Sequence, residues 1–196
     1  MKPQTISKED RQILLELARR SLEAAARKRP LPRISLADYS NRLQQNGASF
    51  VTLTSQGALR GCIGTLEAYQ SLVQDVCDHA ASAAIEDFRF SPVSPVEVQM
   101  IAIEVSVLTA PVKLEYETPV DLMAKLSPGE DGVILRDGRL RATFLPQVWD
   151  QLADKAEFLS HLCSKMGAAP SLWKIKNLEV FTYQVEEFRD LEAELD

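Results

Sequence analysis

Cysteine and histidine are scarce in this sequence of 196 residues, which has only Cys62, Cys77, Cys163, His79 and His161. An odd number of cysteines without a CxxC pair excludes a disulfide framework and a cysteine-rich zinc site, and it favours a reducing compartment. No pair of His, Cys or carboxylate residues has the spacing of metal ligands, so no metal site is predicted. A phosphate-binding loop and a dinucleotide fingerprint are also absent, so no cofactor is indicated.

Long apolar runs and an excess of basic charge are absent as well. No apolar run approaches the roughly 20 residues that a membrane helix needs. The N-terminal stretch is basic and amphipathic, without the apolar core of a secretory signal. The formal net charge of −6 disfavours a nucleic-acid partner, because phosphate binding requires a basic face. We therefore expect a cytoplasmic protein that binds neither nucleic acid nor membrane.

The composition that remains is ordinary for a globular domain, with 45% hydrophobic and 26% charged residues. The charges are unevenly distributed. Residues 1–30 carry eight Lys or Arg and four acids, whereas residues 178–196 carry seven acids and one Arg. Two interpretations are open: the two ends pair with each other, or the N-terminal helix docks on a partner.

Helices are predicted where apolar residues recur at helical spacing after a capping residue. They are expected from Ser7 up to Pro30, from Ser35 to about Gln45, from Ser71 through Ala84, after Thr118, and from about Gln147 to Met166. Strands are predicted where side chains alternate or β-formers cluster. They are expected at Phe50–Thr54, Leu59–Thr65, Met100–Leu108, Gly132–Arg136, Arg139–Leu145 and Leu178–Glu186.

The order hairpin, helix, strand occurs twice, in residues 50–108 and 132–186. Turns at Gln56-Gly57 and Asp137-Gly138 close the two hairpins, and Asp-Gly is a strong hairpin signal. The segment LRGC at residues 59–62 also aligns with LRAT at residues 140–143. Chance or internal duplication accounts for this match. We predict a single α+β domain over residues 1–196, with helices packed outside a largely antiparallel sheet. If the two similar halves share one sheet, that sheet would be barrel-like.

Several predicted strands have one apolar face and one face with polar side chains. The polar members are Arg60 and Cys62, Glu104 and Ser106, and Arg141 and Thr143. A sheet with one wet face needs no function. However, Gly61 and Gly64 flank Cys62, and glycine in a strand costs stability unless a bulge or a close backbone approach requires it. A neighbouring arginine would also favour the Cys62 thiolate.

Residues 59–64, LRGCIG, resemble the signature of the AMMECR family, also called AmmeMemoRadiSam system protein A. Residues 87–92, DFRFSP, are similar to its D-x-R-F-x-P motif, and further segments near residues 104–108, 144–148 and 158–165 also fit. Met166 departs from the pattern, because a small residue is usual there. The resemblance implies one α+β unit of two similar halves and a site around Arg60-Gly61-Cys62. It also implies a Memo-like protein and a radical SAM protein as partners, but no particular reaction.

One hypothesis for this site is an enzyme with Cys62 as nucleophile, which would need a neighbouring base. His79 and His161 are expected on exposed, polar helix faces, so Glu104 is the candidate base. Cys77 and Cys163 lie on apolar helix faces and are expected in the core.

Two further hypotheses need no catalysis. In the first, Arg60, Arg89 and Arg141 hold a small anionic ligand bidentately, with Ser106 on the same face and Gly61 and Gly64 letting the ligand approach the backbone. The alternative is that these arginines form structural pairs with Asp87 and Glu104. In the second hypothesis the domain is a protein-interaction module.

Overall fold

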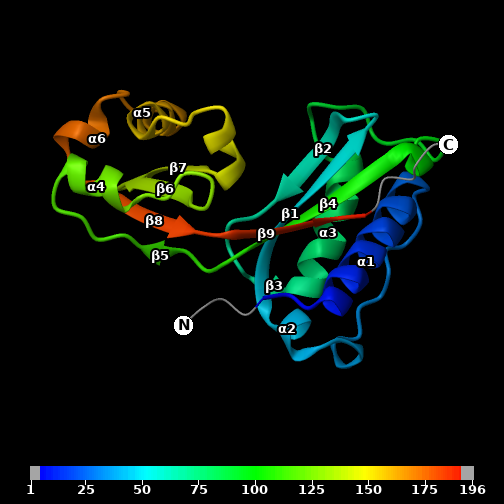
Figure 1. The fold of residues 1–196 in the computed structure, drawn as a ribbon. Coiled ribbons are helices and arrows are strands. Elements are labelled where there is room, and N and C mark those ends of the chain that lie inside the picture. The colour runs from blue at the N-terminus through cyan, green and yellow to red at the C-terminus, as the bar shows by residue number, and fades with distance from the viewer. Residues whose placement is uncertain (1–4, 191–196) are drawn as a thin grey trace. The chain divides into compact units, whose positions relative to one another are not determined.

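The computed structural model describes residues 5–190, which form two compact units (Figure 1). Unit 1 runs to Leu108 and resumes at Glu186, and unit 2 is Thr109–Val185. The elements of unit 1 are α1 (Lys8–Ala26), η1 (Leu36–Asp38), α2 (Asn41–Gln44), β1 (Asn46–Ser55), β2 (Ala58–Gly64), β3 (Gln70–Ser71), α3 (Leu72–Ile85), η2 (Val98–Met100), β4 (Ile101–Leu108) and β9 (Val185–Arg189). None of the helices within residues 5–190 is long and apolar enough to span a membrane.

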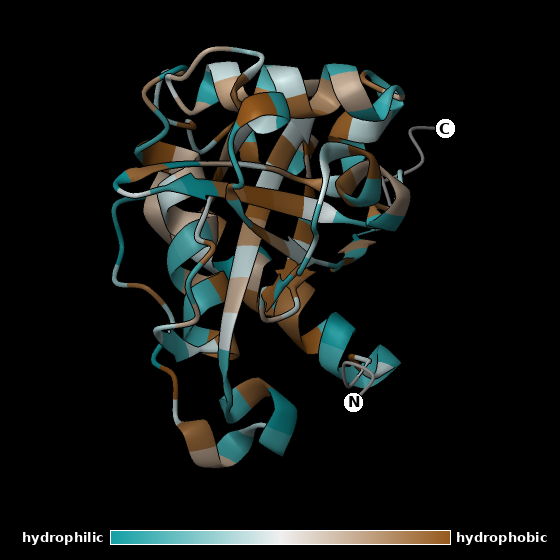
Figure 2. Cartoon of the chain, turned by 90° about the vertical axis from the view of Figure 1, so that its left-hand side faces the viewer, coloured by the Kyte–Doolittle hydropathy of each residue, from teal (hydrophilic) through white to brown (hydrophobic). Residues whose placement is uncertain are grey.

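Unit 1 is built on one sheet with the strand order β2-β1-β4-β9, and β3 adds to the start of β1. Strands β2, β3 and β4 all pair with β1 in antiparallel orientation. Helices α1 and α3 pack on one face of this sheet, where the strands contribute Val51, Leu53 and Ile103 to the core. Figure 2 shows the matching pattern, in which hydrophobic bands alternate with polar or neutral bands along the strands.

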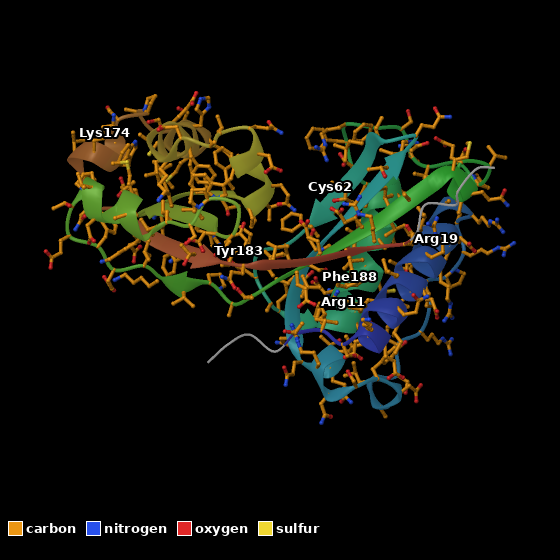
Figure 3. All side chains as sticks on the ribbon, in the orientation of Figure 1. Arg11, Arg19, Cys62, Lys174, Tyr183 and Phe188 are labelled. Carbon is orange, nitrogen blue, oxygen red and sulfur yellow. The ribbon has the colours of Figure 1, made fainter. Side chains whose placement is uncertain are left out.

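Helix α1 begins as the sequence indicates, with the Ser7 Oγ accepting a hydrogen bond from the Asp10 N–H at 3.0 Å. Ion pairs then join this basic helix to the acidic end of the chain, between Arg11 and Glu186 and between Arg19 and Asp190 (both arginines are labelled in Figure 3). The interpretation that the two ends pair with each other is confirmed at these positions.

Unit 2 contains the second sheet, with the order β5-β8-β6-β7 and antiparallel pairing throughout. Its elements are β5 (Val112–Lys113), α4 (Pro119–Lys125), β6 (Gly132–Asp137), β7 (Leu140–Phe144), η3 (Pro146–Asp150), α5 (Lys155–Lys165), α6 (Leu172–Ile175) and β8 (Glu179–Tyr183). Its core contains Trp149 stacked on Phe158, with ring centroids 3.6 Å apart. Gly167 follows α5 with a φ of 82°, as expected for a residue that ends a helix.

The α+β class and the antiparallel pairing are confirmed, but the strands form two separate sheets and, within residues 5–190, no closed barrel. The two halves share their topology: the hairpin and third strand have the order β2-β1-β4 in one unit and β7-β6-β8 in the other. Each half therefore builds its own sheet instead of sharing one.

Three predicted elements have different bounds. The single strand expected at Leu178–Glu186 is wrong, because β8 and β9 are separate strands that belong to different sheets. The helical stretch expected from about Gln147 to Met166 is divided into η3 and α5, since Asp154 accepts from the Glu157 N–H and starts a new helix. The helix expected at 35–45 is reduced to two short turns, η1 and α2.

Candidate functional site

Cys62 lies on β2, the edge strand of the first sheet, and its side chain shares a row with those of two neighbouring strands. Thr52 on β1 is opposite both Cys62 and Glu104, so the three side chains point to one face. The Thr52 hydroxyl lies 3.3 Å from the Cys62 Sγ and donates to it. Gly61, the preceding residue, faces helix α3, so Cys62 points to the opposite face, away from α1 and α3.

Ser106 and Glu104 occupy the same face but both have partners. Phe50 is opposite Ser106, which places the serine one row from Glu104 on the face that carries Cys62. Ser106 is buried and its hydroxyl lies 3.3 Å from Glu187 Oε1. Glu104 forms an ion pair of 3.0 Å with Arg189 on β9. The alternation in the sequence therefore correctly placed Cys62, Glu104 and Ser106 on one face, and their roles stay a prediction.

Arg60 sits at an irregularity of β2 and pairs with an unexpected acid. Leu53 is opposite Gly61 and Thr54 is opposite Leu59, so Arg60 is the extra residue of a β-bulge. Its Nε donates to Glu97 Oε1 at 3.1 Å. The hydrogen bonds from Ser94, and after them the one from Arg60, hold the pKa of Glu97 at about 2. The partners considered from the sequence, Asp87 and Glu104, are both occupied elsewhere.

Asp87 and Arg89 bind the backbone of Cys62 from outside the sheet. Asp87 is buried and accepts a hydrogen bond of 2.9 Å from the Cys62 N–H, and Arg89 Nη2 donates to the Cys62 carbonyl at 3.3 Å. Two further bonds, of 2.9 and 2.6 Å, join the guanidinium to the Asp87 carboxylate. The Arg89 guanidinium is the largest cause of an Asp87 pKa far below its usual range. Together the two side chains bind the backbone N–H and C=O of Cys62, which a neighbouring strand would otherwise bind at this edge of the sheet.

The glycines beside Cys62 are explained by packing within unit 1. A Cβ at Gly61 would lie 2.2 Å from the Ala83 carbonyl oxygen of α3, so glycine is needed where the helix crosses the strand. A Cβ at Gly64 would lie 2.4 Å from the Phe50 ring and from the Ser49 carbonyl. The close approaches that these glycines allow are therefore to the protein itself, and the structure accounts for both without a ligand.

The expectation that His79 is exposed is wrong. This histidine is buried, with its Nδ1 3.1 Å from Asp75 Oδ2, and the hydroxyl of Ser49 donates to the same oxygen at 2.6 Å. The side chains of Ser49 and Thr52 point to opposite faces of the sheet, because the two residues are three positions apart on β1. The cluster of Ser49, Asp75 and His79 therefore lies on the face opposite Cys62. Since the serine contacts the acid and not the imidazole, the three residues do not have the order of a catalytic triad. His161 is exposed on α5, as expected.

The remaining predicted residues lie within the cores or in unit 2. Cys77 and Cys163 are buried as expected, and burial raises the pKa of both thiols. Cys62 is the cysteine with a partly exposed side chain. Arg141 lies on β7, opposite Arg136 on β6. Across residues 5–190, no group of three or more His, Cys, Asp or Glu side chains is arranged to hold a metal ion.

Sequence reasoning missed two exposed hydrophobic residues beside this site. Phe88 is 96% exposed and Val96 is 80% exposed. Each neighbours an acid that ties the 86–97 segment to β2, Asp87 in one case and Glu97 in the other. The sequence held no local signal for either residue, because their exposure follows from the contacts that Asp87, Arg89 and Glu97 make with β2.

Comparison with known proteins identifies the family of this chain. The AMMECR1 family profile matches residues 15–188. A protein of Methanothermobacter thermautotrophicus is 36% identical over 191 residues, which is 97% of this chain and 99% of that protein. A protein of Methanosarcina acetivorans is 36% identical over 185 residues, 93% of this chain and 92% of that one. The crystal structure of an uncharacterized protein from Pyrococcus horikoshii superposes with a TM-score of 0.85 at 33% identity, covering 95% and 94% of the two chains. The chain belongs to the AMMECR1 family.

Proposed function

We propose that unit 1 binds a small polar ligand on the sheet face that carries Thr52, Cys62 and Glu104, with the Cys62 thiol in contact with the ligand. The observation that carries this proposal is the position of the thiol. Cys62 is partly exposed, on the face away from α1 and α3, and is aligned with a hydroxyl and a carboxylate. Hydroxyl and carboxylate groups at fixed spacing suit a ligand with several hydrogen-bonding groups.

The arrangement favours binding over nucleophilic catalysis. Glu104 is two strands from Cys62, a separation of roughly 10 Å between backbones at the usual strand spacing. A general base must lie within hydrogen-bond reach of the proton that it removes, and Glu104 is paired with Arg189 instead. His79 lies on the other face of the sheet and is held by Asp75. The Cys-His pair of acyl-transfer enzymes thus finds no support here.

Of the three arginines that the sequence suggested for an anionic ligand, the two in unit 1 have structural partners. Arg60 is paired with Glu97, and Arg89 is paired with Asp87. Because each charge is offset by a carboxylate, these side chains contribute to the position of β2 more than to the attraction of an anion. The proposed ligand is therefore polar and needs no net negative charge, and its donors would share the Glu104 carboxylate with the exposed Arg189 side chain.

Alkylation by iodoacetamide tests the exposure on which the proposal depends. Brief labelling of the folded protein at neutral pH, followed by mass spectrometry, should modify Cys62 at least about tenfold faster than Cys77 and Cys163, because burial shields those sulfurs. Equal or slower labelling of Cys62 would show that the thiol is a packing residue, and the proposed contact with a ligand would be lost with it.

Ligand binding itself is tested by thermal shift with a set of polar metabolites. A compound that binds the proposed face should raise the melting temperature of the wild type, protect Cys62 from iodoacetamide, and lose both effects in Glu104→Gln. Glu9→Gln is the matched control, because it makes the same charge change at an exposed position in the first turn of α1. Equal responses of the two variants would place the ligand elsewhere.

A second function, protein interaction, is favoured by Phe88 and Val96. Exposed apolar side chains next to residues that ion pairs hold in place are typical of recognition surfaces. Family resemblance suggests a Memo-like protein and a radical SAM protein as partners. We expect Phe88→Ser to weaken binding to such a partner from the same genome in biolayer interferometry. Val120→Ser, at a 71% exposed apolar position in unit 2, is the control, and unchanged binding by Phe88→Ser would exclude this surface.

A further inference from the structure

A cleft of about 260 Å³ opens beside the C-terminal end of helix α1, outside the site around Cys62. Its charged lining consists of Arg20, Glu23, Arg27 and Arg29, and prolines of the following segment complete its wall. Positions 20, 23 and 27 are one and two turns apart, so their side chains share one face of the helix. The cleft therefore gathers three guanidinium groups and one carboxylate.

The backbone at the end of α1 fixes the third arginine in this group. Lys28 has a φ of 53°, the left-handed conformation that glycine usually provides after a helix. The Lys28 N–H donates to the Ala25 carbonyl at 3.0 Å, and the Arg29 N–H donates to the Ala24 carbonyl at 2.8 Å. This pair of bonds is the Schellman motif, which reverses the chain so that Arg29 returns beside Ala24. The motif holds Arg29 against the face that carries Arg20 and Arg27.

The arginines of α1 and of the turn that follows it divide into two groups by their partners. Arg11 and Arg19 form ion pairs with acids of the last strand and the residue after it, Glu186 and Asp190. In the part of the chain that the structure describes, Arg20, Arg27 and Arg29 form no ion pair or hydrogen bond through their side chains, and Glu23 is the one acid of the cleft lining.

Helix-end electrostatics alone do not account for this group. Cations near a helix C-terminus gain about 0.3–1 kcal/mol from the helix dipole, and that effect falls off beyond the last turn. Arg20 lies well before the last turn of α1, and Arg29 lies beyond the helix. Three like charges around one cleft also repel each other, in a protein whose net charge is −6. An anion in the cleft would offset that repulsion.

We propose that this cleft binds a small phosphate-bearing ligand through Arg20, Arg27 and Arg29. Guanidinium groups present paired donors that match the oxygens of a phosphate, and their charge persists at every physiological pH. The cleft volume is slightly below the range of about 300–1,000 Å³ typical of sites for drug-sized ligands. It therefore suits a phosphate or diphosphate with at most a small organic group. This inference is independent of the function proposed for Cys62, because α1 packs on the other face of the sheet.

Isothermal titration calorimetry with pyrophosphate tests the site. We expect the wild type to bind pyrophosphate at low ionic strength, and the double variant Arg20→Gln/Arg27→Gln to bind at least about tenfold more weakly. The matched control is Arg33→Gln/Arg139→Gln, which removes the same charge at two exposed arginines outside the cleft and should keep the affinity within about twofold. Because all four arginines are exposed, both double variants should keep the wild-type melting temperature.

Two results would overturn the proposal. Equal weakening in the two double variants would mean that pyrophosphate responds to overall charge, and an absence of heat with the wild type at about 5 mM pyrophosphate would mean that the cleft is not an anion site. Parallel titrations with inorganic phosphate and with glycerol 3-phosphate distinguish the source of the phosphate. Tighter binding of glycerol 3-phosphate would identify an organic phosphate as the ligand, and equal binding would identify the free anion.

Discussion

Replacing Asp87 by asparagine tests how the edge of the first sheet is held. The Asp87 carboxylate accepts one hydrogen bond from the Cys62 N–H and the rest from Arg89, through its backbone N–H, Nε and Nη2. Asparagine has the same shape but only one acceptor oxygen, and it directs an amide NH₂ toward another donor. At least one charge-assisted bond to the guanidinium is therefore lost, together with the ion pair.

The expected cost follows from the burial of the two partners. Breaking a fully buried ion pair by removing one charge costs about 3–5 kcal/mol. Asp87 is buried, but the Arg89 side chain is 45% exposed, so water rehydrates the released guanidinium and reduces the cost to about 2–3 kcal/mol. In a protein of this size each kcal/mol lowers the melting temperature by about 2–4 °C. Asp87→Asn should therefore melt about 4–12 °C below the wild type.

Circular dichroism is the appropriate probe, because both tryptophans, Trp149 and Trp173, lie in unit 2 and their fluorescence would not report on this edge. Asp38→Asn is the control, since it removes the same charge from an exposed position in unit 1. If Asp87→Asn and Asp38→Asn melt together, the pair does not hold the edge and the reasoning is refuted.

The pH dependence gives an independent check on the same pair. The folded pKa of Asp87 lies far below the value of about 3.9 expected in the unfolded chain. Its stabilisation is therefore complete above about pH 4 and decreases as the pH falls below that value. The difference in stability between wild type and Asp87→Asn should be constant at neutral pH and shrink in acid. A difference that grows on acidification would contradict the assignment.

Three further predictions concern the residues around β2, each measured by urea denaturation. Arg60→Ala should cost about 1 kcal/mol, because the Glu97 side chain is partly exposed and keeps its bonds from Ser94, and a loss above about 3 kcal/mol would indicate a buried pair. Gly61→Ala should cost more than about 2 kcal/mol, since its Cβ would meet the Ala83 carbonyl at 2.2 Å, and a neutral effect would show that α3 moves freely. Glu97→Gln should remove the part of the stability that is lost between about pH 4.5 and 2, because the folded pKa of Glu97 is about 2.

Local signals in the sequence were sufficient for much of the fold. The Ser7 cap, the Asp137-Gly138 hairpin and the alternation in β4 depend on neighbours within a few residues, and the structure has all three. The alternation also placed Cys62 and Glu104 on one face, because each strand turns its apolar side chains to the core and its polar side chains to the opposite face. The caps, turns and strand faces were therefore predictable, because each depends on residues that are close in the sequence.

Other features depended on contacts between distant segments and were missed. The partner of Arg60 is 37 residues away, and the bulge that turns Arg60 toward it has no signature in the sequence. His79 was placed in solvent because its helix face is polar, whereas Ser49 and Asp75 bury it in a polar cluster. The boundary between β8 and β9 was missed because the residue between the two strands is not a glycine or proline that would signal a turn, although the strands join different sheets.

The Asp87–Arg89 pair also separates the two surfaces that we propose for function. An incoming strand at the edge of β2 would need the outward N–H and C=O of Cys62, and these groups are already bound by Asp87 and Arg89. A partner at the edge therefore meets the exposed Phe88 ring rather than the backbone of β2. A ligand of the thiol must approach from the sheet face, past Thr52. The Asp87–Arg89 pair blocks the approach along the edge of β2 but not the approach from the sheet face. Changes at Phe88 should therefore affect protein partners without altering the labelling of Cys62.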